Sequence, residues 1–393
     1  MKICKHFGIC GGCSFQDIPY SQQVTTKKNR VEALIKKYGI KTLTKEVNTF
    51  DTWFYRNKME FTFFEKDSGI ICGFHEKENK RQVTALSECP ISFSDTDVIL
   101  SAVCAFAQKN GYSAYNKYSH KGFLRNLIIR QSKFTKQTMI VLVTTDEIEF
   151  NVEKYKEMII SIPCEYPVNS VYRVVNNSWS DAVVFEKKEH IWGEEYIVEK
   201  INDLKFKIGP DTFFQVNPKG MSSLYSKIML YADLTRKKRI LDLYCGAGGI
   251  GMGLAKKADF VWGVELSPDI VKFAQENAEQ NNIKNITFIA QDVRLFLNTQ
   301  DNTDKKIDLV VVNPPRGGLS QKVIRAIKRL LPSKLIYSSC NPEALCRDLK
   351  EFSDQYTIEF VEPFDFFPHT KHLECLAVLT KNNDEKDIKN GII

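Results

Sequence analysis

The fold of this chain is decided by a glycine-rich segment, Ile240-Leu241-Asp242-Leu243-Tyr244-Cys245-Gly246-Ala247-Gly248-Gly249-Ile250-Gly251. A short apolar run leads into it, and three of its glycines, Gly246, Gly248 and Gly251, have the G-x-G-x-x-G spacing. Glu265 ends the next apolar run, 19 residues after Gly246. Such glycines let the backbone turn sharply and approach a ligand, while the acid can accept hydrogen bonds from ribose hydroxyls. The order strand, loop, helix, strand and glutamate predicts a site for an adenosine-containing cofactor.

Around this segment, apolar strands and helical stretches alternate from about residue 208 onward. Helical stretches separate the first five strands, which predicts a doubly wound parallel sheet. The last two strands follow each other without a helix, so we expect an antiparallel addition at one edge. The predicted strands are 240–243, 260–264, 286–289, 309–312, 335–337, 357–361 and 374–379. The fold class is therefore α/β, with a Rossmann-like carboxyl-terminal domain.

The earlier part of the chain has a different pattern. Residues 21–38 are expected to form an amphipathic helix that Gly39 ends. From Trp53 to about Lys200, short β segments alternate with one or two helical stretches. We therefore divide the chain into an α+β amino-terminal domain, residues 1–207, and the Rossmann-like domain, residues 208–393.

The glycine spacing does not separate a dinucleotide from S-adenosylmethionine. Two neighbouring features favour S-adenosylmethionine. Asp242, at the end of the first strand, would repel a pyrophosphate, and Asn313-Pro314-Pro315-Arg316 after the fourth strand is typical of methyltransferases.

Chemically reactive residues follow three of the predicted strands or stand beside them. Cys340 lies in Ser338-Ser339-Cys340-Asn341-Pro342, Arg316 follows the fourth strand, and Glu374 comes close behind two histidines. Ligands of open α/β sheets bind outside the carboxyl ends of the strands. We therefore expect one active site that combines a thiol nucleophile with an acid that accepts a proton. Pro342 favours the first turn of a helix, so Cys340 would stand just before a helix amino terminus, which stabilises a thiolate.

Composition limits the class of protein and suggests a partner. The chain has 393 residues, 43% of them hydrophobic, and a formal net charge of +7. It shows neither a signal peptide nor a membrane-spanning run, so we expect a cytoplasmic protein without membrane attachment. Residues 98–145 contain no Asp or Glu but seven basic residues with interleaved aromatics. This stretch suits an RNA backbone and unstacked bases, and a solvated basic face is the alternative.

Four early cysteines form a second candidate site. Cys4, Cys10 and Cys13 have the spacing C-x5-C-x2-C, and Cys89, followed by Pro90, is the expected fourth ligand. The pattern fits a zinc site and an iron–sulfur cluster about equally well. Disulfides are disfavoured in the cytoplasm.

Taken together, the motifs resemble the S-adenosylmethionine-dependent RNA uracil-C5 methyltransferases. The resemblance covers nearly the full length, because segments near the amino terminus match as well as the carboxyl-terminal half. The matching segments are 55–58, 122–127, Phe213-Phe214-Gln215-Val216-Asn217-Pro218, 242–248, 313–318, 338–342 and 367–374.

The resemblance implies a role for individual residues. Cys340 would be the nucleophile that adds to carbon 6 of the uracil, and Glu374 the acceptor of the carbon-5 proton. Phe213 and Arg316 would lie near the target base. The cofactor contacts would come from Gln215, Tyr244, Gly246, Glu265 and Asn313.

The resemblance also implies a branch of the family. Many members have Asp where this chain has Asn313, and Asn is similar to the branch that methylates uridine 747 of 23S ribosomal RNA. The four cysteines resemble those of branches that carry a [4Fe-4S] cluster, with Cys4, Cys10, Cys13 and Cys89 as ligands. The chain begins at these cysteines, which leaves no room for the small β-barrel RNA-binding module of some relatives. We therefore expect a monomer that acts on 23S ribosomal RNA.

Several alternatives stay open at this point. The same chemistry would serve another 23S ribosomal uridine or uridine 54 of transfer RNA. A cytosine-C5 methyltransferase also uses a thiol, and adenine amino-group methyltransferases also have Asn-Pro-Pro, although they need no cysteine. From a different class, the chain would be an iron–sulfur RNA-binding sensor without catalysis.

Overall fold

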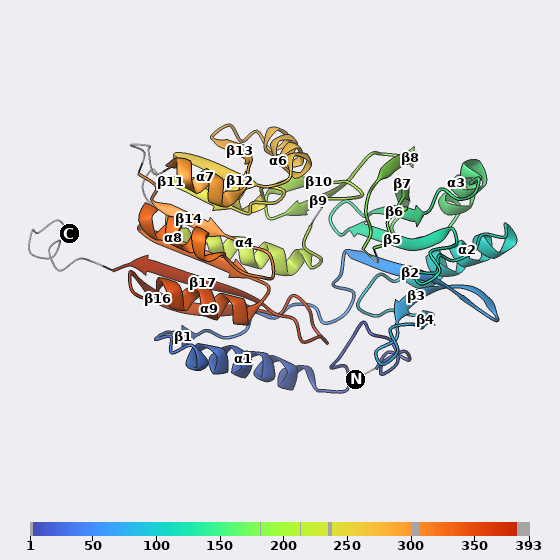
Figure 1. Cartoon of the computed structure of the whole chain (residues 1–393), viewed down its shortest axis with the longest axis horizontal. Helices are drawn as coiled ribbons and strands as arrows, with labels where there is room; N and C mark the ends of the chain where they lie inside the picture. The colour runs from blue at the N-terminus through green and yellow to red at the C-terminus, as the bar shows by residue number, and fades with distance from the viewer. Residues whose placement is uncertain (1–2, 181, 213, 235–237, 301–305, 383–393) are drawn as a thin grey trace, which may run out of the picture.

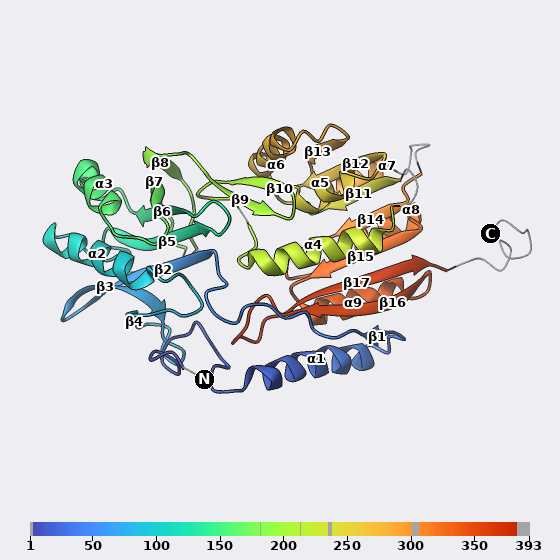
Figure 2. The same ribbon diagram turned by 180° about the vertical axis from the view of Figure 1, so that it is seen from behind.

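The structure is a computed structural model that describes residues 3–180, 182–212, 214–234, 238–300 and 306–382 (Figure 1). Two large sheets lie beside each other along the long axis of the molecule, and the reverse view in Figure 2 shows the same arrangement. One sheet belongs to the amino-terminal region and the other to the Rossmann-like region.

The Rossmann-like sheet has, among the described residues, eight strands in the order β1-β16-β17-β15-β14-β11-β12-β13. Strands β11 to β15 are mutually parallel, and β17 is antiparallel to both β15 and β16. Their bounds are β1 Leu43–Thr44, β11 Arg239–Leu243, β12 Phe260–Glu265, β13 Ile286–Ala290, β14 Leu309–Val312, β15 Lys334–Ser339, β16 Tyr356–Phe364 and β17 Glu374–Lys381. The predicted parallel sheet and its antiparallel addition are confirmed, and β17 lies between β15 and β16.

Helices cover both faces of this sheet, as expected for a doubly wound fold. They are α4 Pro218–Ala232, α5 Gly249–Ala255, α6 Pro268–Gln280, α7 Val293–Gln300, α8 Gln321–Leu330 and α9 Pro342–Phe352. One apolar core includes residues of α7, α8 and α9, and a second includes residues of α4 and α5. The chain leaves β11 toward β12 and β13, then returns to the other side of β11 at β14. This reversal between β11 and β14 is the point at which open α/β sheets bind ligands.

The amino-terminal sheet has the strand order β4-β3-β2-β5-β6-β7-β8. One of its faces packs on α2 (Thr96–Lys109) and α3 (Val152–Ile160). The other face shares an apolar core with a hairpin of β9 (Ile197–Ile201) and β10 (Leu204–Ile208), and with α6. Its strands are β2 Lys58–Lys66, β3 Gly69–His75, β4 Val83–Ala85, β5 Leu124–Ser132, β6 Gln137–Thr144, β7 Val168–Val175 and β8 Lys187–Gly193. The two regions are therefore joined by a continuous hydrophobic core.

The first helix, α1 (Tyr20–Lys37), packs on the Rossmann-like region rather than on the sheet that follows it in sequence (Figure 1). Its apolar residues Val31 and Ile35 enter the same core as α8 and α9. Strand β1 continues from α1 and pairs in parallel with β16, with Leu43 opposite Phe360. The domain boundary after residue 207 stays a prediction. Residues 20–44 come before this boundary in the sequence but pack on the Rossmann-like region, which comes after it.

Within the part of the chain that the structure describes, no helix is long and apolar enough to cross a membrane.

Candidate active site

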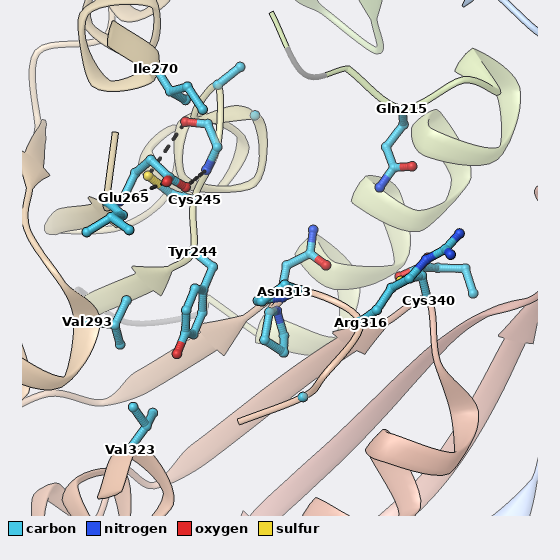
Figure 3. Close-up of a pocket in the computed structure, with 18 of the residues that line it drawn as sticks. Gln215, Tyr244, Cys245, Glu265, Ile270, Val293, Asn313, Arg316, Val323 and Cys340 are labelled. Atoms are coloured by element: carbon cyan, nitrogen blue, oxygen red, sulfur yellow. Dashed lines mark hydrogen bonds between the residues drawn. The ribbon is translucent and has the colours of Figure 1, made fainter. Parts of the chain in front are cut away.

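A cavity of about 1260 Å³ opens at the reversal point of the Rossmann-like sheet (Figure 3). It exceeds the usual size of a pocket for one small ligand, so it has room for a cofactor and a nucleotide. Phe213 lies outside the described residues, but every other predicted catalytic, cofactor and target-base residue lines this cavity. They are Gln215, Tyr244, Gly246, Glu265, Asn313, Arg316, Cys340 and Glu374.

The glycine-rich loop between β11 and α5 has the strained backbone that its sequence requires. Gly246 and Gly248 have φ values of 53° and 81°, and Tyr244 adopts a φ of 60°. A Cβ on Gly248 would lie 2.4 Å from the ring of Phe288, whereas one on Gly246 would meet only open space. Because Gly246 also lines the cavity, its missing side chain leaves room for a ligand at the backbone.

Asp242 does not face the ligand, which corrects our interpretation of its role. It is fully buried beneath the loop, and its Oδ2 accepts a hydrogen bond from the Gly251 N–H at 2.8 Å. Burial raises the pKa of Asp242 to about 7. Its visible function is therefore to join β11 to the start of α5 rather than to repel a pyrophosphate.

Glu265 ends β12 and reaches the cavity, as the glycine-rich pattern predicted. Its two carboxylate oxygens accept hydrogen bonds from the backbone N–H groups of Gly246 at 3.2 Å and Leu266 at 2.8 Å. These bonds fix the carboxylate next to the loop, where Figure 3 shows it beside Cys245 and Ile270. An oriented carboxylate at this place can accept hydrogen bonds from a ribose.

Asn313 and Gln215 approach the cavity from opposite sides. Asn313 follows β14, and its backbone N–H donates to the Leu243 carbonyl oxygen at 3.2 Å. Gln215 precedes α4, and its carbonyl oxygen accepts a hydrogen bond from the Asn57 side chain at 3.0 Å. Figure 3 shows Asn313 between Tyr244 and Cys340, and the Gln215 side chain above Arg316 and Cys340. They are placed to contact a ligand that extends from the glycine-rich loop toward the thiol.

Cys340 follows β15 and stands immediately before α9, as the sequence predicted. Asn341 caps the helix, since its side chain accepts a hydrogen bond from the Glu343 N–H, and Pro342 begins it. Burial raises the pKa of the Cys340 thiol, the nearby Glu374 adds to this effect, and Arg316 opposes it. Figure 3 shows Arg316 and Cys340 next to each other. The net shift runs against our expectation of a stabilised thiolate, so Arg316 is the local group that favours ionisation.

Glu374 is the first residue of β17 and is 1% exposed, although it lines the cavity. Its Oε1 accepts a hydrogen bond from the buried hydroxyl of Ser338 on the neighbouring strand at 2.8 Å. Burial raises the pKa of Glu374 to about 7. A carboxyl group with this pKa can take up a proton and release it near neutral pH. Sequence reasoning gave Ser338 no role, because a serine at a strand end carries no distinctive signal.

The four predicted cysteine ligands come together in space. All four are partly buried free thiols, and they line one small cavity together with Pro90 and Ile91. The four are Cys4, Cys10, Cys13 and Cys89. Burial raises the pKa of Cys13 to about 11, and burial together with the other three cysteines raises that of Cys89 to about 12. Among the described residues, no group of three or more His, Cys, Asp or Glu side chains has the geometry to hold one metal ion.

The basic segment is divided between surface and interior. Tyr118 and Trp179 are 61% and 79% exposed, and Trp179 stacks on His120 with 5.1 Å between ring centroids. Arg125, one of the seven basic residues in the stretch 98–145 that we expected to suit an RNA backbone, is in contrast buried, so this expectation is wrong for it. Its guanidinium donates to the carbonyl oxygens of residues 176, 178 and 180 at 2.6 to 2.8 Å. Arg125 therefore holds the loop that presents Trp179.

The chain is similar to known proteins over nearly its full length. A family model described as "tRNA (Uracil-5-)-methyltransferase" matches residues 19–382. An uncharacterized RNA methyltransferase of Caldanaerobacter subterraneus subsp. tengcongensis is 37% identical, over 96% of this chain and 84% of that protein. An uncharacterized RNA methyltransferase of Clostridium tetani is 36% identical, over 97% of this chain and 84% of that protein.

A solved structure has the same architecture. The crystal structure of Pyrococcus abyssi tRNA (uracil-54, C5)-methyltransferase in complex with S-adenosyl-L-homocysteine is similar with a TM-score of 0.77. The two chains are 29% identical, and the similarity covers 95% of this chain and 86% of that one. These comparisons confirm the family that the ordered motifs indicated. The chain belongs to the RNA (uracil-C5)-methyltransferase family and is an S-adenosylmethionine-dependent enzyme.

Proposed function

We propose that Cys340 is the nucleophile and Glu374 the proton acceptor of this RNA (uracil-C5)-methyltransferase. The observation that carries the proposal is that both side chains open to one cavity at the carboxyl ends of β14 and β15. Arg316 lies beside Cys340 and lines the same cavity (Figure 3). An amino-group methyltransferase would need neither the thiol nor the buried acid.

The cofactor site would be formed by the glycine-rich loop and its neighbours. Glu265 is fixed where it can accept hydrogen bonds from the ribose hydroxyls, and Gly246 leaves room at the backbone. Tyr244, Asn313 and Gln215 complete a path from this loop toward Cys340 (Figure 3). S-adenosylmethionine supplies, when bound, an electrophilic methyl group on sulfur.

The residues around the target base would carry the remaining chemistry. Carbon 5 of uracil is a weak nucleophile, so the Cys340 thiolate first adds to carbon 6 and converts the ring to an enolate. Arg316 would favour the thiolate before attack, since its positive charge opposes the rise that burial causes in the pKa of Cys340. After carbon 5 has been methylated, Glu374 takes the carbon-5 proton, the double bond re-forms and the thiolate leaves. Phe213 is proposed to hold the uridine once it has been flipped out of any stack.

We propose 23S ribosomal RNA as the substrate, with the position equivalent to uridine 747 as the target. Asn313 in place of the more frequent Asp supports this branch. Uridine 54 of transfer RNA is the second candidate, since the similar enzyme of Pyrococcus abyssi is named for that position. Mapping 5-methyluridine in RNA from cells that lack the gene decides between them. Loss of the base from transfer RNA alone would overturn the ribosomal assignment.

The four-cysteine site is proposed to hold a [4Fe-4S] cluster. In such a cluster each thiolate binds a different iron, so the four sulfurs surround a volume rather than one ion. The four cysteines line one cavity, which fits this arrangement. Among the described residues they do not form a site for a single metal ion, and a cluster with four irons does not require one. Because the pKa values of Cys13 and Cys89 are raised, the four thiols can be ionised together only when a positively charged group stabilises the thiolates. Methyl transfer needs no electron, so we assign the cluster a structural role.

Replacing Cys13 by serine should remove the cluster. Anaerobically purified protein should contain about four irons and four sulfides per chain, and Cys13→Ser should lose both together with the brown colour. Iron analysis and the visible absorption spectrum measure this. Cys164→Ser, at a partly buried cysteine outside the site, is the matched control and should keep its iron. Stoichiometric zinc without iron in the wild type would contradict the proposal.

The exposed part of the basic segment is proposed to contact RNA. Lys117 and Lys121 lie in the same loop as Tyr118 and His120, next to the exposed ring of Trp179. The double change Lys117→Ala and Lys121→Ala should weaken RNA binding and reduce the salt slope by about 0.7 for each lost phosphate contact to a single strand. Filter binding at several salt concentrations measures the slope. Lys36→Ala with Lys41→Ala, two exposed lysines in the last turn of α1 and just after it, is the control. An unchanged slope in the first variant would place the RNA elsewhere.

A further inference from the structure

The turn between β16 and β17, residues 365–373, leads directly into Glu374. Two of the cavity residues are attached to it, Phe367 within the turn and Glu374 at its end. The orientation of the Glu374 carboxylate therefore depends on how firmly this turn is held.

The turn has a strained residue at its centre. His369 is 1% exposed and has a φ of 63°, a conformation that a non-glycine residue adopts only when its surroundings impose it. The ring of Trp53 stacks on His369 with 4.0 Å between centroids, which fixes one side of the turn. The Tyr55 hydroxyl also donates to the Pro368 carbonyl oxygen at 3.2 Å, and the Asn217 side chain donates to the Phe366 carbonyl oxygen at 3.1 Å. Further contacts come from α1 and from the segment that follows Cys13.

The face of α1 that lies against the turn carries polar side chains. Gln23, Lys27 and Arg30 are four and three residues apart, so they point to the same side of the helix. Gln23 accepts a hydrogen bond from the His369 N–H at 3.0 Å, and Lys27 donates to the Phe367 carbonyl oxygen at 3.1 Å. Arg30 donates to the carbonyl oxygen of Lys371 at 3.1 Å. Three successive points of the turn are thus bonded to one helix.

Two side chains on this face are buried although they are polar or charged, and such burial costs free energy of folding. Gln23 and Lys27 are 1% and 3% exposed. Lys27 forms a buried ion pair with Asp365 at 2.6 Å, and Asp365 also accepts a hydrogen bond from the Tyr20 hydroxyl. Apolar residues of similar size often serve stability as well as a buried ion pair does. The directional bonds therefore specify the geometry of the turn more than they stabilise the fold.

The cysteine segment is bonded to the same turn. The backbone N–H groups of Ser14 and Phe15, directly after Cys13, donate to the His369 carbonyl oxygen at 2.8 and 3.1 Å. The Gln23 side chain joins the two elements, because its Nε2 also donates to the Phe15 carbonyl oxygen at 2.7 Å. The conformation of the cysteine segment is thereby transmitted to the residues that precede Glu374.

We propose that Gln23 and Lys27 are positioning residues for Glu374, and that the segment after Cys13 acts with them by holding the 365–373 turn. The inference rests on the proposed role of Glu374 as proton acceptor. When the carboxylate takes the carbon-5 proton, the C5–C6 double bond forms and the C6–S bond breaks. Loosening the turn slows this step, while addition of the Cys340 thiol to carbon 6 and methylation of carbon 5 continue, because Cys340 follows β15 and is not attached to this turn.

The test compares Gln23→Leu with Gln22→Leu in the full chain. Gln22 is the exposed neighbour on the same helix, so its variant controls for the change in residue type. Turnover of Gln23→Leu should fall by about 10- to 100-fold, the range expected for a small misplacement of a catalytic group. Its affinities for S-adenosylmethionine and RNA should stay within about twofold, and a methylated protein–RNA adduct should accumulate. Hydrogen exchange should become faster in residues 365–373, and the same acceleration is expected in Cys13→Ser.

The outcomes separate this inference from the assignment of Glu374. Glu374→Gln is measured in parallel. If it traps the adduct and Gln23→Leu does not, the positioning role is overturned. The positioning role is also overturned if Gln23→Leu loses affinity for S-adenosylmethionine and RNA to the same extent as it loses turnover, and forms no adduct. Such equal losses indicate that the variant has lost structure in general. If Glu374→Gln forms no adduct, the assignment of Glu374 fails, and hydrogen exchange still decides whether Gln23 holds the turn. Should Gln23→Leu not fold, Lys27→Met with Asp365→Asn replaces the buried ion pair by neutral groups of similar size for the same measurements.

Discussion

Cys340→Ala is expected to bind RNA and S-adenosylmethionine and to form no methylated product. Without the thiol, carbon 5 of the uracil is not converted to a nucleophile, so the rate should fall by roughly four orders of magnitude or more. Transfer of a labelled methyl group to RNA, under single-turnover conditions, measures the loss. Binding should persist because the cofactor loop and the basic surface are separate from β15.

Cys164→Ala serves as the control for this experiment. It removes a partly buried cysteine of the amino-terminal region that does not line the active-site cavity. Its rate should match that of the wild type. Methylation by Cys340→Ala near the wild-type rate would rule out a covalent mechanism and restore an amino-group methyltransferase as the better interpretation.

Glu374→Gln is expected to trap the enzyme on its RNA. The amide cannot accept the carbon-5 proton, so thiol addition and methylation proceed but elimination stalls, and turnover falls by about 10² to 10⁴-fold. A protein–RNA adduct stable to denaturing electrophoresis should accumulate. Glutamine has nearly the same shape as glutamate, and it can keep the hydrogen bond from the Ser338 hydroxyl.

Two comparisons complete this second experiment. The double variant Cys340→Ala with Glu374→Gln should form no adduct, and the wild type should form one only with 5-fluorouridine at the target. The pH dependence of the wild type gives an independent measurement. Because burial raises the pKa of Glu374 to about 7, turnover limited by elimination should decrease as the pH falls below about 7. An adduct in the double variant would show that another group is the nucleophile.

Much of the Rossmann-like region could be predicted from the sequence because its signals are local. Strands in a parallel sheet are short apolar runs, and Gly246, Gly248 and Pro342 mark the loop and helix starts that follow two of them. Since the carboxyl ends of parallel strands lie at one edge, the convergence of Arg316 and Cys340 followed from these assignments.

Other features depend on which segments meet in space, and no local pattern reveals that. Asp242 and Arg125 were interpreted as groups that face ligands, but both are buried and bond to backbone atoms. The helical pattern identified the apolar face of α1, yet Gln23 and Lys27 gave no sign that they are buried. Their partners are in the 365–373 turn, more than three hundred positions away in the sequence. The parallel pairing of β1 with β16 was likewise not foreseeable.

The placement of α1 and β1 has a consequence for how the protein is made. Both elements are translated well before their partners, because β1 pairs with β16, and the turn that α1 holds lies just before β17. At about 5–20 residues per second, they wait roughly 15 to 60 seconds for these partners. During that time Val31 and Ile35 lack part of the core that α8, α9 and β17 complete. Contacts this distant also slow the folding itself. The proposed active site is therefore complete only once Glu374, the first residue of β17, has been translated.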